Sequence, residues 1–163
     1  MDAINLLEEQ HDEVEDMFEK VEKATTAVAR RKLFEQIGDA LAVHAAIEEK
    51  IFYPACKTDE TSDNLYEAVE EHLAAKRLIA DLIELDAADE HYRAKLVVLQ
   101  EEIRHHIREE RKEIFPKAKK LLDKAQREEL GAQMEQLAAS LQQGRQPPRM
   151  QVPSETETAA DLM

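Results

Sequence analysis

The chain has 163 residues, of which 43% are hydrophobic and 36% charged, and this predicts one globular domain without an apolar run long enough to span a membrane. Its 22 basic and 36 acidic residues give a formal net charge of −14, which argues against nucleic-acid binding because phosphates are bound by basic side chains. A single cysteine excludes an internal disulfide, and the acidic N-terminal segment lacks the features of a signal peptide, so we expect a cytoplasmic protein.

The first predicted element is a helix of about six turns that starts near residue 4. Its apolar residues recur at steps of three and four, which is the spacing of one buried helix face. These residues are Ile4, Leu7, Val14, Phe18 and Val21. His11 occupies the one gap in this buried stripe, so its side chain is expected to point into the core.

The second predicted helix runs from about residue 29 to 56. Leu33, Ile37 and Leu41 begin its apolar stripe, and the next two stripe positions are His44 and Glu48. A helical spacing of four residues turns the second side chain by only about 40° and moves it by about 6 Å. The imidazole and the carboxylate are therefore expected to face the same interior space.

Two further helices are predicted, one beginning near Ser62 and one after Asp89 as its N-cap. The buried stripe of the third carries His72, and that of the fourth carries His106 and Glu110. Short connections between long helices make neighbours antiparallel. We therefore predict an all-α protein in which residues 1–122 form an up-down-up-down four-helix bundle.

The segment after the bundle divides into two parts. Residues 123–143 form a short additional amphipathic helix, which either caps the bundle or makes a dimer contact, so both a monomer and a homodimer are compatible with the sequence. Residues 144–163 are rich in proline and acidic residues, a composition that favours a flexible tail. Such a tail is either inert or a partner-binding segment.

The four histidines belong to an internal repeat. His11 is followed after 32 residues by HAAIEEKIFYP, and His72 after 33 residues by HIREERKEIFP. In each copy a proline, Pro54 or Pro116, follows the glutamate by six residues and is expected to end or kink the helix. This alignment pairs His44 with His106 and leaves the neighbouring His105 half-exposed.

The repeat also places the polar groups at one depth in the bundle. Residues equally distant from a hairpin turn lie at the same height, because each residue adds about 1.5 Å of rise. The midpoints between the paired histidines fall in the predicted turns, so all four converge on one layer. Buried carboxylates and imidazoles need compensation, which a metal ion supplies, and this donor set suits Fe, Mn or Zn. Without metal, we expect Glu48 and Glu110 to share protons, with at least one pKa raised.

The pattern of His11, His44-Ala-Ala-Ile-Glu48, His72 and His106-Ile-Arg-Glu-Glu110 resembles the hemerythrin-like HHE cation-binding domain family over residues 1–122. The resemblance implies a non-haem di-iron centre, with Mn or Zn as substitutes. It also implies that His11 and His44 bind one metal ion, that His72 and His106 bind the other, and that Glu48 and Glu110 bridge them.

The sequence departs from the oxygen-carrying hemerythrins, which have an additional histidine one turn from a third-helix ligand. Here those positions are Ala68 and Lys76. The chain is more similar to bacterial members with four His and two Glu, which handle O2, peroxide, nitric oxide or iron. Catalase- or peroxidase-like turnover, non-enzymatic sensing or storage, and a purely structural bundle are the three functional hypotheses.

Three other features have alternative interpretations. Tyr53 is expected in core packing, unless the proline-bent backbone brings its phenol toward the metal. Lys76 on a buried stripe either extends to the surface or steers anionic ligands toward the centre. The hypothesis of a ferritin-like di-metal site rests on Glu8-x-x-His11 and Glu102-x-x-His105. It fails, because it gives the stripe residues of the second and fourth helices no role.

Overall fold

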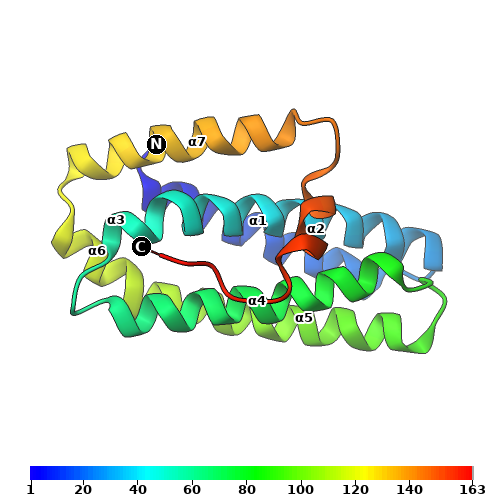
Figure 1. The fold of residues 1–163 in the computed structure, drawn as a ribbon. Helices are drawn as coiled ribbons and strands as arrows, with labels where there is room; N and C mark the ends of the chain where they lie inside the picture. The colour runs from blue at the N-terminus through cyan, green and yellow to red at the C-terminus, as the bar shows by residue number, and fades with distance from the viewer. Residues whose placement is uncertain (163) are drawn as a thin grey trace.

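The structure, a computed structural model, describes residues 1–162 and confirms the predicted all-helical fold (Figure 1). In chain order the elements are α1 (Ala3–Lys23), α2 (Ala27–Ile47), the π-helical turn η1 (Glu48–Phe52), α3 (Tyr53–Cys56), α4 (Ser62–Glu84), α5 (Glu90–Glu109), the π-helical turn η2 (Glu110–Ile114), α6 (Phe115–Leu121), α7 (Lys124–Gln142) and the 3-10 helix η3 (Pro148–Glu155).

Two antiparallel hairpins build the bundle. Helices α1 and α2 form the first hairpin, and α4 and α5 form the second. Side-chain caps fix where the helices begin: Asp2 accepts a hydrogen bond from the backbone of α1, Thr26 from that of α2, and Asp89, as predicted, from that of α5. These caps keep the connections short and set the two helices of each hairpin side by side.

The second helix of each hairpin continues into a π-helical turn: η1 follows α2, and η2 follows α5. In η1 the backbone N–H of Tyr53 reaches the carbonyl of Glu48, and in η2 that of Phe115 reaches the carbonyl of Glu110. The wide turn directly precedes Pro54 and Pro116, whose rings would clash with the carbonyl four residues back in a regular helix. The chain therefore remains helical past each proline, as far as Cys56 and Leu121, rather than ending there.

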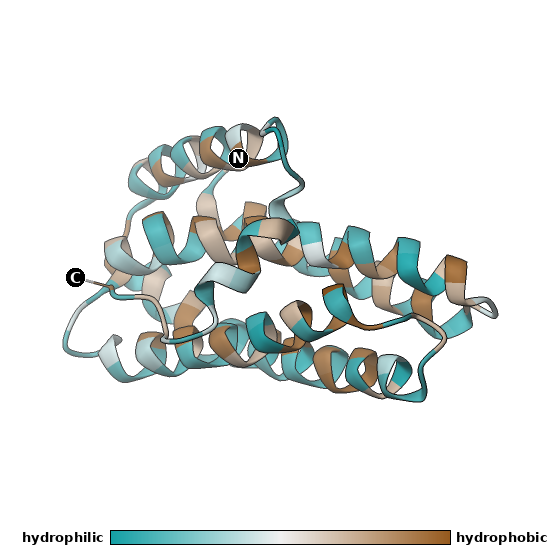
Figure 2. Ribbon diagram, turned by 45° about the vertical axis from the view of Figure 1, so that its right-hand side comes forward, coloured by the Kyte–Doolittle hydropathy of each residue, from teal (hydrophilic) through white to brown (hydrophobic). Residues whose placement is uncertain are grey.

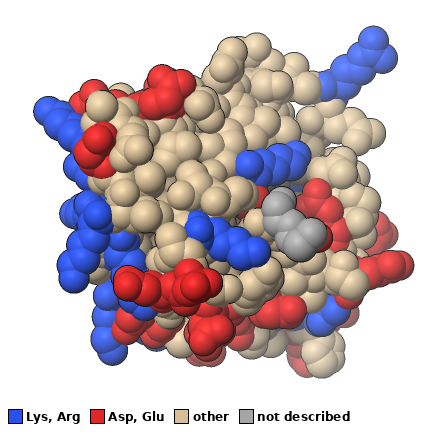
Figure 3. Space-filling model, turned by 60° about the vertical axis from the view of Figure 1, so that its left-hand side comes forward, with Lys and Arg blue, Asp and Glu red and all other residues tan. Residues whose placement is uncertain are grey.

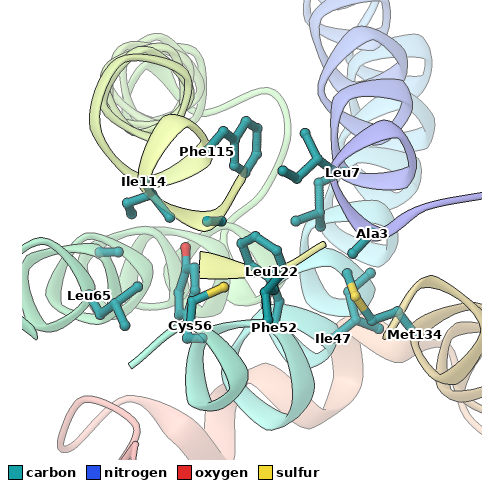
Figure 4. Packing of buried hydrophobic residues seen from close by; sticks show 14 of the residues in the cluster. Ala3, Leu7, Ile47, Phe52, Cys56, Leu65, Ile114, Phe115, Leu122 and Met134 are labelled. Atoms are coloured by element: carbon teal, nitrogen blue, oxygen red, sulfur yellow. The ribbon is translucent and has the colours of Figure 1, made fainter. Parts of the chain in front are cut away.

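The apolar core is divided into two clusters. One lies at the end of the bundle near α3, α6 and α7, and residues such as Leu7, Phe52 and Phe115 pack in it (Figure 4). The other lies toward the hairpin turns and includes Phe34 and Tyr92. Brown and teal segments alternate along the helices in Figure 2, as expected for helices with one apolar stripe. A layer of buried polar side chains separates the two clusters.

Helix α7 packs against α1 and α2 of its own bundle. Asp123 begins it with a capping box that also uses Gln126. Met134 is fully buried against the bundle, and Gly131 lies where the start of the chain crosses α7, close to the carbonyl oxygen of Met1. Of the two placements that the sequence left open for this helix, the structure therefore shows packing on the bundle.

The prediction of a flexible tail from residue 144 is wrong for the described part of that segment. Residues 148–155 form η3, which lies against α2 and α4, and both Val152 and Leu162 are 2% exposed. The tail cannot build a core of its own, but Val152 and Leu162 enter the two apolar clusters of the bundle. Arg149 adds ion pairs with Asp39 and Glu35 that fix the segment in place.

No described helix has both the length and the apolar character needed to cross a membrane. The face drawn in Figure 3 carries acidic and basic side chains that are intermixed around an uncharged area.

Replacing Gly131 by alanine tests the close contact between α7 and the start of the chain. The added methyl group collides with the backbone at Met1 and Asp2, which cannot move as easily as the end of a flexible side chain. We expect Gly131→Ala to lower the free energy of unfolding in urea by about 1–3 kcal/mol. Gly144→Ala is the control, because its new methyl group makes only ordinary contacts. Equal stability of the two variants would show that α7 does not depend on this contact.

Candidate metal centre

The structure brings together all six residues that the sequence singled out. They are His11 on α1, His44 on α2, Glu48 at the start of η1, His72 on α4, His106 on α5 and Glu110 at the start of η2. None of the six is more than 6% exposed. Their potential ligand atoms form two groups, within each of which all atoms lie within 4.8 Å of one another: His11, His44, Glu48 and Glu110, and Glu48, His72 and His106. These buried groups are able to hold metal ions.

Each carboxylate lies between the two hairpins. Glu48 Oε1 is 3.1 Å from Nε2 of His44 in the first hairpin and 3.0 Å from Nε2 of His72 in the second. Glu110 Oε1 likewise lies 3.0 Å and 3.2 Å from the Nε2 atoms of one histidine of each hairpin. Both carboxylates therefore occupy positions from which they can bridge two metal ions.

An oxygen acceptor holds the outer nitrogen of every one of the four histidines. The Nδ1 atoms pair as follows: His11 with Glu8 Oε1 at 2.9 Å, His44 with Gln10 Oε1 at 2.7 Å, His72 with Glu49 Oε2 at 2.7 Å and His106 with Glu71 Oε1 at 2.8 Å. Ionised carboxylates and amide oxygens only accept hydrogen bonds, so the Nδ1 atoms carry the protons. This tautomer leaves each Nε2 lone pair pointing into the centre, as a metal ligand requires.

The converging lone pairs leave the centre short of positive charge. The Nε2 atoms of His72 and His106 are 3.2 Å apart, so two lone pairs face each other unless a proton or a cation lies between them. His44 Nε2 and Glu48 Oε2 are buried without a hydrogen-bond partner among the described residues. Unpaired buried polar atoms of this kind are costly. The donor set of four imidazoles and two carboxylates fits borderline transition-metal ions such as iron, because these ions accept both nitrogen and oxygen ligands.

Protons on the imidazoles, not on the carboxylates, compensate the charges when no metal is bound. Burial alone lowers the pKa of His44, but the negative charges of Glu48 and Glu110, whose Oε1 atoms lie 3.1 Å and 3.8 Å from its Nε2, outweigh burial and raise that pKa to about 9. Burial raises the pKa of Glu110, yet the charge of His106 and the neighbouring hydrogen bonds hold it well below its usual range. The pKa of Glu48 is lowered as well, against burial and the charge of Glu110, mainly by His44. The expectation that a carboxyl pKa would be raised is therefore wrong, because the histidines take up the protons first.

Tyr53 lies in the centre itself. Its hydroxyl donates a hydrogen bond to Glu110 Oε2 at 2.8 Å and is 3.4 Å from His106 Nε2. In a regular helix nine residues would turn it about 180° away from His44, but one extra residue in the π turn changes this angle by about 100°. The sequence-based expectation of plain core packing misses this turn, and the alternative with the phenol near the metal describes the geometry.

The second hairpin has a phenyl ring where the first has a phenol. Tyr53 stacks on His72 with ring centroids 5.6 Å apart, and Phe115, the matching residue of the repeat, stacks on His11 at 5.8 Å. The two halves of the centre are therefore alike in histidines and carboxylates but differ by one hydroxyl group. The difference falls on the half that contains His72 and His106.

Lys76 is buried rather than extended into solvent. Its Nζ donates to Glu49 Oε1 at 2.9 Å and lies 3.1 Å from Glu155 Oε1 in η3, and only 7% of the residue is exposed. Glu49 in turn accepts the Nδ1 proton of His72. Lys76 thus orients a histidine through Glu49 and joins the centre to the C-terminal segment.

An apolar cavity of about 40 Å³ adjoins the centre. The four histidines form one part of its wall, aliphatic side chains such as Val14, Ile79 and Ile103 form much of the rest, and Val152 and Glu155 close one side. A volume of this size holds one or two water-sized molecules. The histidines therefore face a space that admits a small ligand and excludes a large one.

One further histidine behaves as the sequence predicts. His105 is more than half exposed and pairs with Glu71 at 2.9 Å instead of entering the core, which supports the register of the fourth helix. Cys56 is buried, and burial together with the charges of Glu110 and Glu48 raises its pKa to about 12. The thiol therefore stays protonated in the metal-free protein.

Sequence reasoning missed three of the four acceptors that orient the histidines, namely Glu8, Gln10 and Glu71. Gln10 directly precedes His11 and Glu71 directly precedes His72, and each orients the histidine on the other helix of its hairpin. The repeat contains this signal, because both positions carry an oxygen acceptor. Glu8, considered only as a ferritin-like ligand, instead holds the Nδ1 of His11 and is itself held by Arg111.

Comparisons with known proteins agree with this geometry. The family described as "Hemerythrin HHE cation binding domain" matches residues 2–118. A crystal structure of a hemerythrin HHE cation binding domain-containing protein from Mycobacterium kansasii is similar, with a TM-score of 0.77 and 22% identity over 93% of this chain and 99% of that one. At this identity the likeness concerns the fold. A search of curated proteins gave no significant match.

The protonated histidines predict how the stability of the metal-free protein depends on pH. A pKa raised from 6.5 to about 9, as for His44, gives stability that is complete below the unfolded pKa and lost as pH rises through the folded one. The lowered pKa values of Glu48 and Glu110 act only at the acidic end, below about 4.5. We therefore expect the melting temperature of the metal-free protein, measured by circular dichroism, to decrease as the pH is raised from 6.5 to 9. A melting temperature that rises over this range would contradict the protonated state described above.

Proposed function

The chain belongs to the hemerythrin HHE cation-binding domain family, and on this basis we propose that it is a non-haem di-iron protein that binds and turns over a small oxygen species such as hydrogen peroxide. The observation that carries the proposal is the set of four Nε2 lone pairs and two bridging carboxylates beside an apolar cavity. Nitric oxide and O2 are ligands of the same size class.

The geometry supports one assignment of ligands to the two ions. His11 and His44 would hold one iron, because they form a compact group with both carboxylates. His72 and His106 would hold the other, because they form a second group with Glu48, and His106 Nε2 also lies 3.2 Å from Glu110 Oε1. Glu48 and Glu110 would bridge, since each contacts histidines of both hairpins. Bound iron would supply open coordination positions for the ligand and exchange electrons with it. Manganese and zinc accept the same donors.

The residues around the ions have separate tasks. Glu8, Gln10, Glu49 and Glu71 hold the histidines in the tautomer that binds metal. The aliphatic wall keeps bulk water out of the space where the ligand binds. The Tyr53 hydroxyl holds a proton against Glu110 and faces His106, so it is placed either to move that proton or, once ionised, to become a ligand of the second iron.

The metal content of the purified protein tests the proposal. We expect about two iron ions per chain after anaerobic reconstitution with Fe(II), as well as rapid consumption of hydrogen peroxide. His44→Ala and His106→Ala should each lose about half of the iron or more, because they occupy matching positions in the repeat. His105→Ala is the matched control and should keep its iron, since its side chain lies outside the centre.

Other outcomes separate the hypotheses. Less than half an equivalent of Fe, Mn and Zn combined would disprove the metal centre and leave a structural bundle. Two irons with a spectral change but no peroxide turnover would indicate a protein that senses or stores its ligand. Equal iron loss in all three histidine variants would contradict the register of α5.

Replacing Tyr53 by phenylalanine tests whether the phenol binds iron. A ferric phenolate gives a visible charge-transfer absorption, so we expect the oxidised wild-type protein to be coloured and Tyr53→Phe to lose this band while keeping two irons. Tyr92→Phe is the control, because Tyr92 is equally buried but lies in the other apolar cluster. An unchanged band in Tyr53→Phe would mean that the phenol stays protonated on Glu110.

A further inference from the structure

The segment that follows α7 covers one side of the cavity. We call residues 148–157 the C-terminal strap. Its 3-10 helix η3 contacts both α2 and α4, the two helices that come from different hairpins, and the red ribbon in Figure 1 crosses this seam. Val152 fills the seam with 2% of its surface exposed, and both Val152 and Glu155 line the cavity. Without the strap, the cavity would be open to solvent between α2 and α4.

Specific contacts hold the strap on the bundle at both ends. At its start, Arg149 donates two hydrogen bonds to Asp39 and one to Glu35. Gly38 lies directly beneath, and an added Cβ there would be 3.3 Å from Cβ of Arg149. At its end, Arg77 donates to the backbone carbonyls of residues 156 and 157. The strap is therefore a fixed wall of the cavity.

The three charged groups around Lys76, of which Lys76 and Glu155 line the cavity, add up to a negative value. Lys76 lies between two carboxylates, Glu49 at 2.9 Å and Glu155 at 3.1 Å. One positive and two negative groups leave one net negative charge, within a chain whose formal charge is −14. The hypothesis that Lys76 steers anions to the centre therefore lacks support, because Glu155 of the strap occupies the side of Lys76 that an anion would need.

We infer that the C-terminal strap selects the ligands of the metal centre, with Val152 limiting their size and Glu155 disfavouring anions. The inference rests on the proposed function, since it concerns access to bound iron. It names the ligand class as small and uncharged: O2, nitric oxide or undissociated hydrogen peroxide. Glu155 is a specificity-determining residue that acts through Lys76 and through its own charge, without contact to the ligand histidines.

Ligand binding to the iron-loaded full-length protein tests this inference. Azide, an anion at pH 7, is mixed with the oxidised protein, and nitric oxide, which is neutral, with the reduced protein, and association rates are followed spectroscopically. At low ionic strength we expect Glu155→Gln to bind azide roughly twofold to fivefold faster than wild type, with nitric oxide unchanged. The difference should shrink at about 1 M salt, where charges are screened within about 3 Å.

Two more variants separate charge from size. Glu157→Gln makes the same change of charge on an exposed side chain of the strap and should leave both rates at the wild-type values. Val152→Ala removes part of the wall and should accelerate both ligands by a similar factor, and it should also speed the removal of iron by a chelator. Circular dichroism verifies that each variant is folded.

The inference is overturned if Glu155→Gln binds azide like the wild type, if Glu157→Gln matches Glu155→Gln, or if azide binds to none of the variants. Each of these results leaves the di-iron proposal intact as long as iron analysis gives about two equivalents. A wild-type protein that takes up less than half an equivalent contradicts the proposed function itself. Metal analysis and binding kinetics therefore distinguish the two failures.

Discussion

The fold is organised around a buried layer of carboxylate charges and imidazole lone pairs. These groups need a compensating positive charge, because they are buried away from water. Four Nε2 atoms and two carboxylates meet between two apolar clusters, which individually resemble the cores of ordinary helical bundles. Protons on His44 and His106 supply the missing positive charge in the absence of metal, and a bound metal ion would supply it in their place. The acceptors on the outer nitrogens are part of the same requirement, because they keep the lone pairs aimed inward.

The repeat gives the centre a near-twofold design with one functional difference. Each hairpin contributes two histidines, one glutamate and a π turn that ends just before a proline. The π turn brings the following aromatic ring onto a histidine of the layer, Tyr53 onto His72 and Phe115 onto His11. A single hydroxyl therefore makes the two halves chemically unequal. The side chain that differs is also the one that contacts both Glu110 and His106.

The apolar stripes predicted the four long helices and the convergence of the six polar residues, because helical periodicity and equal distances from short turns determine depth and direction. The π turns were not predicted, because no residue pattern distinguishes a wide turn from a proline kink. The position of Tyr53 depends on its π turn and was therefore not predicted either. The packing of the strap on the bundle was not predicted for a different reason. Its composition indicates correctly that it has no core of its own, but composition does not reveal that Val152 and Leu162 complete the core of the bundle.

The position of the strap in the chain also orders events during synthesis. Ribosomes produce the chain from the N-terminal end, and domains fold as their residues emerge. Every residue of the polar layer lies between positions 11 and 110, whereas the segment that seals the seam between α2 and α4 begins at position 148. A nascent bundle therefore exposes its histidines before the wall that contains Val152 exists.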